Sequence, residues 1–313
     1  MKKMKGIILA GGSGTRLSPS TDSINKHLLA VFDKPMIYYP LSVLMLGGIR
    51  EIMIISTPED IHRFEELLGN GSELGISLHY REQPNPNGIP EALTLSEDFI
   101  DNDHVALMLG DNIFYGQGFT TLFRNAIKEH KHATVFGYRV KDARRFGVVE
   151  FDHHQKVVSL EEKPEYPKSD FAVTGLYIYD HKAVRIAKKL KPSERGELEI
   201  TDLNKEYIKF GQLDVELLGR GFAWMDAGTH ESLFEASEFV KITQQRQGFK
   251  LACLEEIAFY LGYISREALY KKGKSMEKND YGKYLLEIAE REHNQQYWES
   301  IDRNPMLGLV ENE

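Results

Sequence analysis

Short apolar runs recur along the first half of this 313-residue chain, and segments long enough for a helix separate them. The four clearest runs are residues 7–10, 52–56, 105–109 and 134–138, and examples of the intervening segments are 40–47 and 61–68. Strands that are apolar throughout are typical of a sheet covered on both faces, and their alternation with helices favours parallel pairing. The sequence therefore predicts an α/β fold with a mixed, mostly parallel sheet flanked by helices.

A glycine-rich loop follows the first apolar run and ends in an arginine. In Gly11-Gly12-Ser13-Gly14-Thr15-Arg16, the missing Cβ atoms let backbone N–H groups approach an anion closely. The Arg16 guanidinium adds a planar, charged fork suited to phosphate oxygens. A dinucleotide fingerprint would need a glycine at position 17, which is leucine, and no Gly-Lys-Ser/Thr triplet of a P-loop follows. We expect a phosphate cradle of another type; the alternative is an ordinary glycine turn.

Two further charged side chains border apolar runs of the chain. Ligands of parallel α/β sheets bind beyond the carboxyl ends of the strands, and Asp111 comes directly after the apolar run 105–109. A carboxylate that faces a phosphate cradle suits a hard cation between the two. Lys26 lies ten residues after Arg16 and opens the apolar stretch 28–32. The alternatives are a turn aspartate and a solvated lysine.

Composition limits the class of protein. With 42% hydrophobic residues the chain can bury a sizeable core, and a net charge of −8 argues against broad nucleic-acid binding. The single cysteine, Cys253, excludes an intramolecular disulfide and favours a reducing compartment. No stretch approaches the length of a membrane span, and the apolar run after the basic start is too short for a secretory signal. We expect a cytoplasmic protein with no membrane or nucleic-acid partner.

The pattern changes near residue 148. Shorter alternating runs at 148–151, 157–160 and 172–179 predict an antiparallel lobe, and helical patterns follow at 231–247, 255–261, 265–271 and 281–292. Ser265 is predicted to cap its helix without a full capping box. We expect a main unit over residues 1–240 with the antiparallel lobe at about 140–225, a helical assembly or regulatory segment at 241–292, and a polar tail at 293–313.

A series of short motifs occurs in order along residues 4–290. They are Leu-Ala-Gly-Gly-Ser-Gly-Thr-Arg at 9–16, Asn-Lys-His-Leu-Leu at 25–29, Gly-Asp-Asn-Ile-Phe-Tyr-Gly at 110–116, Phe-Gly-Val-Val-Glu at 146–150, Glu-Glu-Lys-Pro at 161–164, Val-Thr-Gly at 173–175, Arg-Gly-Glu-Leu-Glu-Ile-Thr-Asp at 195–202 and Trp-Met-Asp-Ala-Gly-Thr at 224–229. In this order they resemble the sugar nucleotidylyltransferases, and most closely the longer bacterial members that act on glucose 1-phosphate.

The resemblance implies a function and an assembly. Members of this type have a Rossmann-like sheet with a smaller sugar-binding lobe, and they transfer a deoxythymidylyl group from dTTP to glucose 1-phosphate. The products are pyrophosphate and dTDP-glucose, which is used in deoxysugar and cell-surface polysaccharide biosynthesis. The resemblance also implies Mg²⁺ as cofactor and a homotetramer built as a dimer of dimers.

The resemblance assigns site residues in this chain. The catalytic cations would be Arg16 and Lys26, which hold the triphosphate, and Lys163, which holds the sugar phosphate. The nucleotide-binding residues would be Leu9, Gly11, Gly12, Gly14, Thr15, Gln83, Gly88 and Asp111. The residues for the sugar phosphate would be Asn112, Gly147, Glu162, Val173 and Arg195, and the metal ligands would be Asp111 and Asp226. Gln83 offers both a donor and an acceptor to the Watson–Crick edge of a pyrimidine.

Several positions depart from the usual residues of the family. His27 and Ala30 replace Gln and Pro, Pro90-Glu91 replaces Ala-Gln near the base loop, and Phe146 replaces Tyr beside the sugar. These changes leave open another pyrimidine triphosphate, such as UTP, or a modified sugar 1-phosphate. Gln117 and Tyr260 replace His and Arg near a second nucleotide site of the longer members, which leaves feedback regulation open.

Two alternatives belong to other classes of protein. A catalytically silent regulatory homologue would be favoured by loss of the phosphate-binding cations or the two aspartates, and all of them are kept. A dinucleotide oxidoreductase is disfavoured by Leu17, which stands where the third glycine of its fingerprint is needed.

Overall fold

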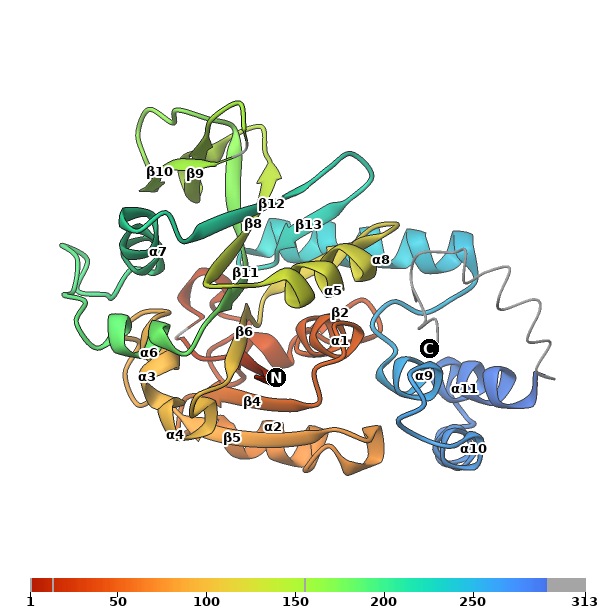
Figure 1. Ribbon diagram of the computed structural model, residues 1–313. Coiled ribbons are helices and arrows are strands. Elements are labelled where there is room, and N and C mark those ends of the chain that lie inside the picture. Colours follow the sequence, from red (N-terminus) through yellow and green to blue (C-terminus); the bar gives the residue numbers. More distant parts are fainter. Residues whose placement is uncertain (1, 13, 155, 292–313) are drawn as a thin grey trace.

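The computed structural model describes residues 2–12, 14–154 and 156–291, and it confirms the predicted α/β architecture (Figure 1). In this part of the chain a nine-stranded sheet forms the centre. Its main path runs through β10 (Val157–Glu162), β9 (Gly147–Phe151), β11 (Phe171–Tyr179), β6 (His104–Leu109), β1 (Met4–Leu9), β4 (Glu51–Ser56) and β5 (Ser77–Glu82). In addition, β8 (Ala133–Arg139) pairs with β11, and β12 (Leu213–Leu218) pairs with β8.

The sheet is parallel where β1, β4, β5 and β6 meet, and it is mixed beyond them because β8 and β12 form a further parallel pair. β1 pairs in parallel with β4 and β6, and β4 pairs in parallel with β5. β11 runs antiparallel to β6, β8 and β9, and β9 and β10 form an antiparallel pair. The predicted antiparallel lobe is therefore joined through β11 to the parallel strands of the same sheet. Two small antiparallel pairs lie outside it, β7 (Asn112–Tyr115) with β13 (Ala223–Asp226) and β2 (Ala30–Val31) with β3 (Lys34–Pro35).

Helices cover both faces of the sheet. Successive residues of a strand point to opposite faces, so each apolar strand contributes side chains to a core on either side. Ile8 belongs to the core cluster that α1 (Tyr38–Leu46), α2 (Ile61–Leu68) and α5 (Phe119–Glu129) help to form. Ile7 belongs to a second cluster, formed with α3 (Glu91–Leu95), α4 (Glu97–Ile100), α6 (Lys182–Ala187) and α7 (Ile200–Lys209). This two-sided burial explains why the strands are apolar throughout.

The C-terminal part is helical, as predicted. It contains α8 (His230–Gln247), α9 (Leu254–Tyr260), α10 (Arg266–Ser275) and α11 (Asp280–Glu290), and Ser265 caps α10 by accepting from the Ala268 N–H at 3.2 Å. Figure 1 places α9, α10 and α11 at the opposite end of the molecule from β9, β10 and α7. α8 continues without a break past the expected unit boundary at residue 240.

The C-terminal tail and the expected lack of a membrane span are the two remaining sequence expectations. The expected polar tail at 293–313 lies outside the described residues. Among the helices that are described, none combines the length and apolar character that a bilayer span requires.

Candidate active site

The glycine loop leaves β1 at the carboxyl edge of the parallel strands. Gly12 and Gly14 have φ angles of 100° and 62°, the left-handed region in which glycine is favoured. A 3₁₀ turn, Thr15–Leu17, follows; Leu17 is fully buried while Arg16 is exposed. The buried leucine anchors the turn, and the arginine next to it is presented to solvent at the edge where ligands of such sheets bind.

A second 3₁₀ turn, Lys26–Leu28, presents Lys26 beside the loop. The Asn25 side chain organises this turn: its Oδ1 accepts from the His27 N–H at 2.9 Å, and its Nδ2 donates to the Ala10 carbonyl at 3.1 Å. Gly12, Gly14 and Lys26 together border a cavity of about 380 Å³. The structure thus brings the predicted loop and the predicted lysine together, and Asn25, whose role the sequence did not reveal, links them.

His27, which replaces the usual glutamine of the family, lies in the protein interior. Its ring is buried and its Nδ1 lies 2.8 Å from Asn25 Oδ1. Burial, with the neighbouring Lys26 charge, lowers the pKa of His27 from 6.5 to about 3, so the ring is neutral at pH 7. A Cβ on Gly110 would lie 2.5 Å from the ring, which shows how closely His27 supports the backbone before Asp111.

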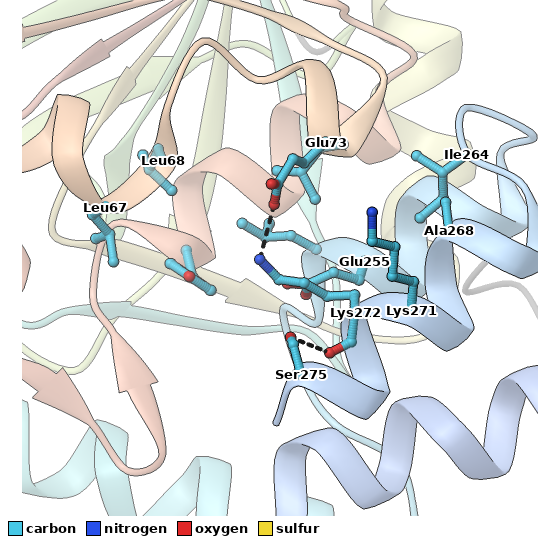
Figure 2. Close-up of a pocket in the computed structure, with 12 residues that line it drawn as sticks. Leu67, Leu68, Glu73, Glu255, Ile264, Ala268, Lys271, Lys272 and Ser275 are labelled. Carbon is cyan, nitrogen blue, oxygen red and sulfur yellow. Dashed lines mark hydrogen bonds and ion pairs between the residues drawn. The ribbon is translucent and has the colours of Figure 1, made fainter. Parts of the chain in front are cut away.

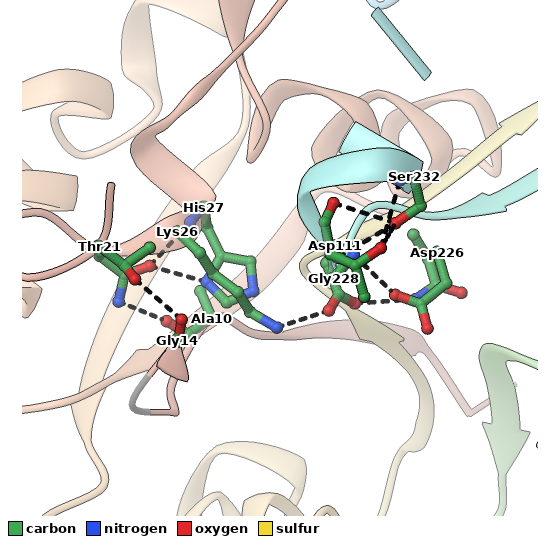
Figure 3. Close-up of polar contacts among 12 residues, drawn as sticks. Ala10, Gly14, Thr21, Lys26, His27, Asp111, Asp226, Gly228 and Ser232 are labelled. Carbon is green, nitrogen blue, oxygen red and sulfur yellow. Dashed lines mark hydrogen bonds and ion pairs between the residues drawn. The ribbon is translucent and has the colours of Figure 1, made fainter. Parts of the chain in front are cut away.

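Asp111 and Asp226 are held together by strand pairing. Asp226 lies opposite Asn112 in the β13–β7 pair, and the Ala227 N–H donates to the Asp111 carbonyl at 2.9 Å. The Asp111 carboxylate accepts from Lys26 Nζ at 2.5 Å (Figure 3). It also accepts from Asn112 Nδ2 at 2.9 Å. The expected carboxylate pair therefore lies next to the expected phosphate-binding lysine.

The two carboxylates have opposite electrostatic environments. Burial opposes ionisation of Asp111, but Lys26 and the hydrogen bonds hold the pKa of Asp111 well below its ordinary value of 3.8. Burial and the nearby Asp111 charge raise the pKa of Asp226, against the weaker opposing effect of Arg16 and Lys26. Asp226 is thus the carboxylate that most lacks a compensating positive charge.

Gly228 makes room for Arg16 beside Asp226. Its N–H donates to Asp226 Oδ1 at 3.0 Å. A Cβ built on Gly228 would lie 2.7 Å from Arg16 Nη2 and 2.8 Å from Asp226 Oδ1, both below any ordinary contact distance. A side chain at this position would therefore displace the Arg16 guanidinium, although the motif that contains Gly228 drew attention only to the aspartate.

A second cavity, of about 120 Å³, borders Asp226 from the antiparallel side. Four of the predicted sugar residues, Asn112, Gly147, Glu162 and Val173, line it, and so does Asp226. The cavity also has lining residues that were not assigned to the site from the sequence, including Arg145, Thr201 and Trp224.

Polar contacts order the walls of this second cavity. Thr201 Oγ1 donates to Glu162 Oε2 at 2.5 Å. Asn112 Oδ1 accepts from the Gly175 N–H at 2.9 Å and from Trp224 Nε1 at 2.6 Å. Asn112 therefore positions Asp111, Trp224 and the β11 backbone, so that most of its hydrogen-bonding capacity is used within the protein.

Lys163 and Arg195 stand outside the set of described residues that line this cavity. Lys163 follows β10 directly, adopts a φ of 42°, and its Nζ lies 3.4 Å from Glu162 Oε1. Arg195 Nη2 pairs with Glu199 at 3.2 Å and Glu197 at 3.4 Å. Lys163 is therefore adjacent to the cavity wall, whereas Arg195 is engaged by two carboxylates on its own loop.

Of the two predicted base-contacting residues, Gln83 lies beside the glycine loop and Gly88 lies beside Leu198. Gln83 directly follows β5, is buried, and its Oε1 lies 3.1 Å from the position of a Cβ on Gly11. Gly88 forms a parallel bridge with Leu198, and a Cβ on Gly88 would lie 2.1 Å from the Leu198 carbonyl oxygen. Gln83 is thus placed beside the glycine loop, and the Gly88 segment is fixed to the segment that precedes α7.

A third cavity, of about 380 Å³, lies apart from these residues. It is formed where α2 approaches α9 and α10, and Leu68, Glu73, Leu254 and Lys272 are among its walls (Figure 2). Lys272 Nζ donates to Glu73 Oε2 at 2.9 Å across it. Its lining mixes apolar and paired charged groups and includes none of the predicted site residues.

Comparison with known proteins identifies the class to which this geometry belongs. A sequence model of the family described as nucleotidyl transferase matches residues 5–243, and the chain belongs to that family. A Neisseria meningitidis serogroup A protein named glucose-1-phosphate thymidylyltransferase is 58% identical, over 92% of this chain and 100% of the relative. A protein of the same name from Xanthomonas campestris pv. campestris is 55% identical, over 93% of this chain and 99% of its own.

A solved structure agrees with these sequence relatives. A crystal structure of a Bacillus anthracis protein described as a glucose-1-phosphate thymidylyltransferase, in complex with sucrose, has a TM-score of 0.70 and 45% identity to this chain. The match covers 76% of this chain and 95% of that chain. The family resemblance expected from the ordered motifs is confirmed.

Proposed function

We propose that this protein transfers a deoxythymidylyl group from dTTP to glucose 1-phosphate, giving dTDP-glucose and pyrophosphate. The observation that carries the proposal is a pair of neighbouring aspartates, of which Asp111 contacts a lysine at one cavity and Asp226 lines the other. One cavity is bordered by the glycine loop and Lys26, and Lys26 is ion-paired to Asp111. The other is bordered by Glu162 and Asp226. Two anionic substrates bound on the two sides would meet at the carboxylates, and the relatives' name fits this pairing of substrates.

The reaction needs charge neutralisation more than proton transfer. An oxygen of the sugar phosphate, already ionised, forms a bond to the α-phosphorus of dTTP, and the bond from that phosphorus to the pyrophosphate oxygen breaks. Positioning and electrostatic stabilisation dominate such phosphoryl transfers. We assign Arg16 and Lys26 to the triphosphate and the departing pyrophosphate, and Lys163 to the sugar phosphate.

The donor set suits Mg²⁺, which we propose as the cofactor. Mg²⁺ binds one or two carboxylates and completes its shell with substrate phosphates and water. Within residues 2–12, 14–154 and 156–291 no group of three or more His, Cys, Asp or Glu side chains could hold a metal. Asp111 and Asp226, neighbours across the β7–β13 pair, would hold the ion together with the triphosphate. When bound, the metal supplies positive charge to the reacting phosphates.

The remaining assignments follow from the resemblance and are proposals too. We place the nucleotidyltransferase domain at residues 1–240 with the sugar-binding lobe at about 140–225, and an assembly or regulatory segment at 241–292. We also propose a homotetramer built as a dimer of dimers, in the cytoplasm. Arg195 is proposed as a second contact of the sugar phosphate, which would require it to leave Glu197 and Glu199.

The test is pyrophosphate release measured over a matrix of nucleoside triphosphates and sugar 1-phosphates in the presence of Mg²⁺. We expect the highest kcat/KM with dTTP and glucose 1-phosphate, and a detectable rate with UTP. A single missing methyl group in an apolar pocket is worth about 1–3 kcal/mol. A higher rate with a purine triphosphate, or no release with any pair, would contradict the proposal.

A further inference from the structure

We propose that Glu91 fixes the orientation of the Gln83 amide and thereby makes the base pocket select a keto pyrimidine over cytosine. Such a base carries an N–H at N3 beside a carbonyl at C4, as thymine and uracil do. The inference rests on the proposed function, because it requires Gln83 to contact the base. It gives a specific role to a residue at which this chain departs from the family pattern.

The hydrogen bonds of Glu91 determine which end of the Gln83 side chain faces it. Glu91 is the first residue of α3, and Gln83 Nε2 donates to its Oε2 at 2.6 Å. An ionised carboxylate is an acceptor only, so it accepts from the amide NH₂ and repels the amide oxygen. The usual ambiguity between the two ends of a glutamine amide is therefore removed at this position.

The other end of the Gln83 amide is directed toward the glycine loop. Gln83 Oε1 lies 3.1 Å from the Cβ position of Gly11, and Gln83 is 5% exposed. The Gln83 backbone is also fixed, because its N–H donates to the Ser56 carbonyl at 2.8 Å. With the backbone held and the NH₂ group bound to Glu91, exchange of the two amide ends would place the oxygen against a carboxylate.

Glu91 is itself held in place by a second donor. Asn87 Nδ2 donates to Glu91 Oε1 at 2.7 Å, so both carboxylate oxygens accept from an amide. Asn87 in turn belongs to the segment fixed to the loop before α7, since its carbonyl accepts from the Leu198 N–H at 2.7 Å. The orientation of Gln83 is thus determined by a chain of contacts that does not involve any substrate.

A fixed amide distinguishes the Watson–Crick edges of the two kinds of pyrimidine. Thymine and uracil place a donor at N3 and an acceptor at O4, whereas cytosine places an acceptor at N3 and a donor at N4. A glutamine can pair with either edge, but the positions of its oxygen and nitrogen must be exchanged between the two. Holding Gln83 in one orientation therefore discriminates against cytosine without any change in the size of the pocket.

The test is the substitution Glu91→Gln, which keeps the size of the side chain but can donate or accept toward Gln83 in either orientation. The matched control is Glu97→Gln, a nearby acid whose carboxylate pairs with Lys188 at 2.6 Å. For each protein, kcat/KM for dTTP and dCTP is measured with glucose 1-phosphate, and calorimetry gives the two binding constants independently of turnover. We expect the dTTP:dCTP ratio to fall by about fivefold or more in E91Q and to stay at the wild-type value in E97Q.

The outcomes separate this inference from the proposed function. A wild-type enzyme that binds dTTP in preference to dCTP but releases no pyrophosphate would contradict the proposed reaction alone. A ratio in E91Q within twofold of wild type, by turnover and by binding, would overturn the role of Glu91 alone. Equal losses for both nucleotides would also overturn it, because they would identify Glu91 as a structural support of the loop. If dCTP binding remains undetectable in E91Q, the proposal is likewise wrong.

Discussion

Gly228→Ala is expected to damage catalysis while leaving the fold intact. The added methyl group would lie 2.7 Å from Arg16 Nη2, and an ordinary contact begins at 3.4 Å. The guanidinium must therefore move by about 0.7 Å or more, and displacements of this order cost up to about 100-fold in rate when they affect a positioned charge. Both neighbours of the methyl group are ends of side chains, so the free energy of unfolding should change by less than about 1 kcal/mol.

The assay is steady-state pyrophosphate release with dTTP varied, together with thermal unfolding. Gly219→Ala is the matched control, because a Cβ on Gly219 meets no heavy atom within 4 Å. We expect G228A to lose about 10- to 100-fold in kcat/KM for dTTP at an unfolding temperature close to that of G219A. Equal kcat/KM values for the two variants would refute the reasoning that Gly228 sets the position of Arg16.

Three further predictions concern the charges of the site. Lys163→Ala should mainly raise KM for glucose 1-phosphate and Arg16→Ala mainly KM for dTTP, because we propose that each cation binds a different anion. Equal rises of both constants in both variants would show that the assigned roles are wrong. Asp226→Asn should raise the unfolding temperature at pH 7 while lowering turnover at least about tenfold, because burial and Asp111 destabilise the ionised carboxylate. This gain in stability should disappear as the pH falls below the ordinary aspartate pKa of 3.8, because Asp226 is then protonated in both the folded and the unfolded protein. A gain that persists below that pH would point to another cause. The free energy of unfolding of the wild-type protein should fall as the pH is lowered from 6.5 to about 3, because His27 takes up a proton in the unfolded chain but not in the folded protein. His27→Gln should flatten this part of the stability curve. An unchanged slope, measured by chemical denaturation, would count against this role of His27.

The sequence predicted best what depends on local pattern. The strands and helices of the first half, the glycine loop after the first strand and the position of Asp111 after a buried strand all follow from neighbouring residues. The ordered motifs then supplied the family. Two features of the fold escaped because they depend on contacts between distant segments: β11 joins the antiparallel strands to the parallel ones, and β13 pairs with β7.

The same limit applies to the candidate site. The roles of Asn25 and Gly228 are defined by what lies opposite them in space, the Ala10 carbonyl for one and the Arg16 guanidinium for the other, and no spacing in the sequence encodes these contacts. The Asn112 amide was expected at the sugar, and its many protein partners could not be read from a motif. The departure at Glu91 was visible in the sequence, but its effect depends on which atoms of Gln83 and Asn87 it accepts from.

The bridge between Gly88 and Leu198 has a consequence for how this enzyme can be redesigned. Leu198 lies two residues before Ile200, which together with Thr201 lines the second cavity, where we propose that the sugar binds, while Gly88 is one of the proposed base-contacting residues. The proposed base and sugar sites therefore share one backbone contact that tolerates no side chain at position 88. Segments 83–91 and 193–201 consequently form one exchangeable unit. A chimera that takes only one of them from a relative will carry a mismatched bridge, and altered nucleotide preference will be accompanied by altered sugar preference unless both segments are exchanged together.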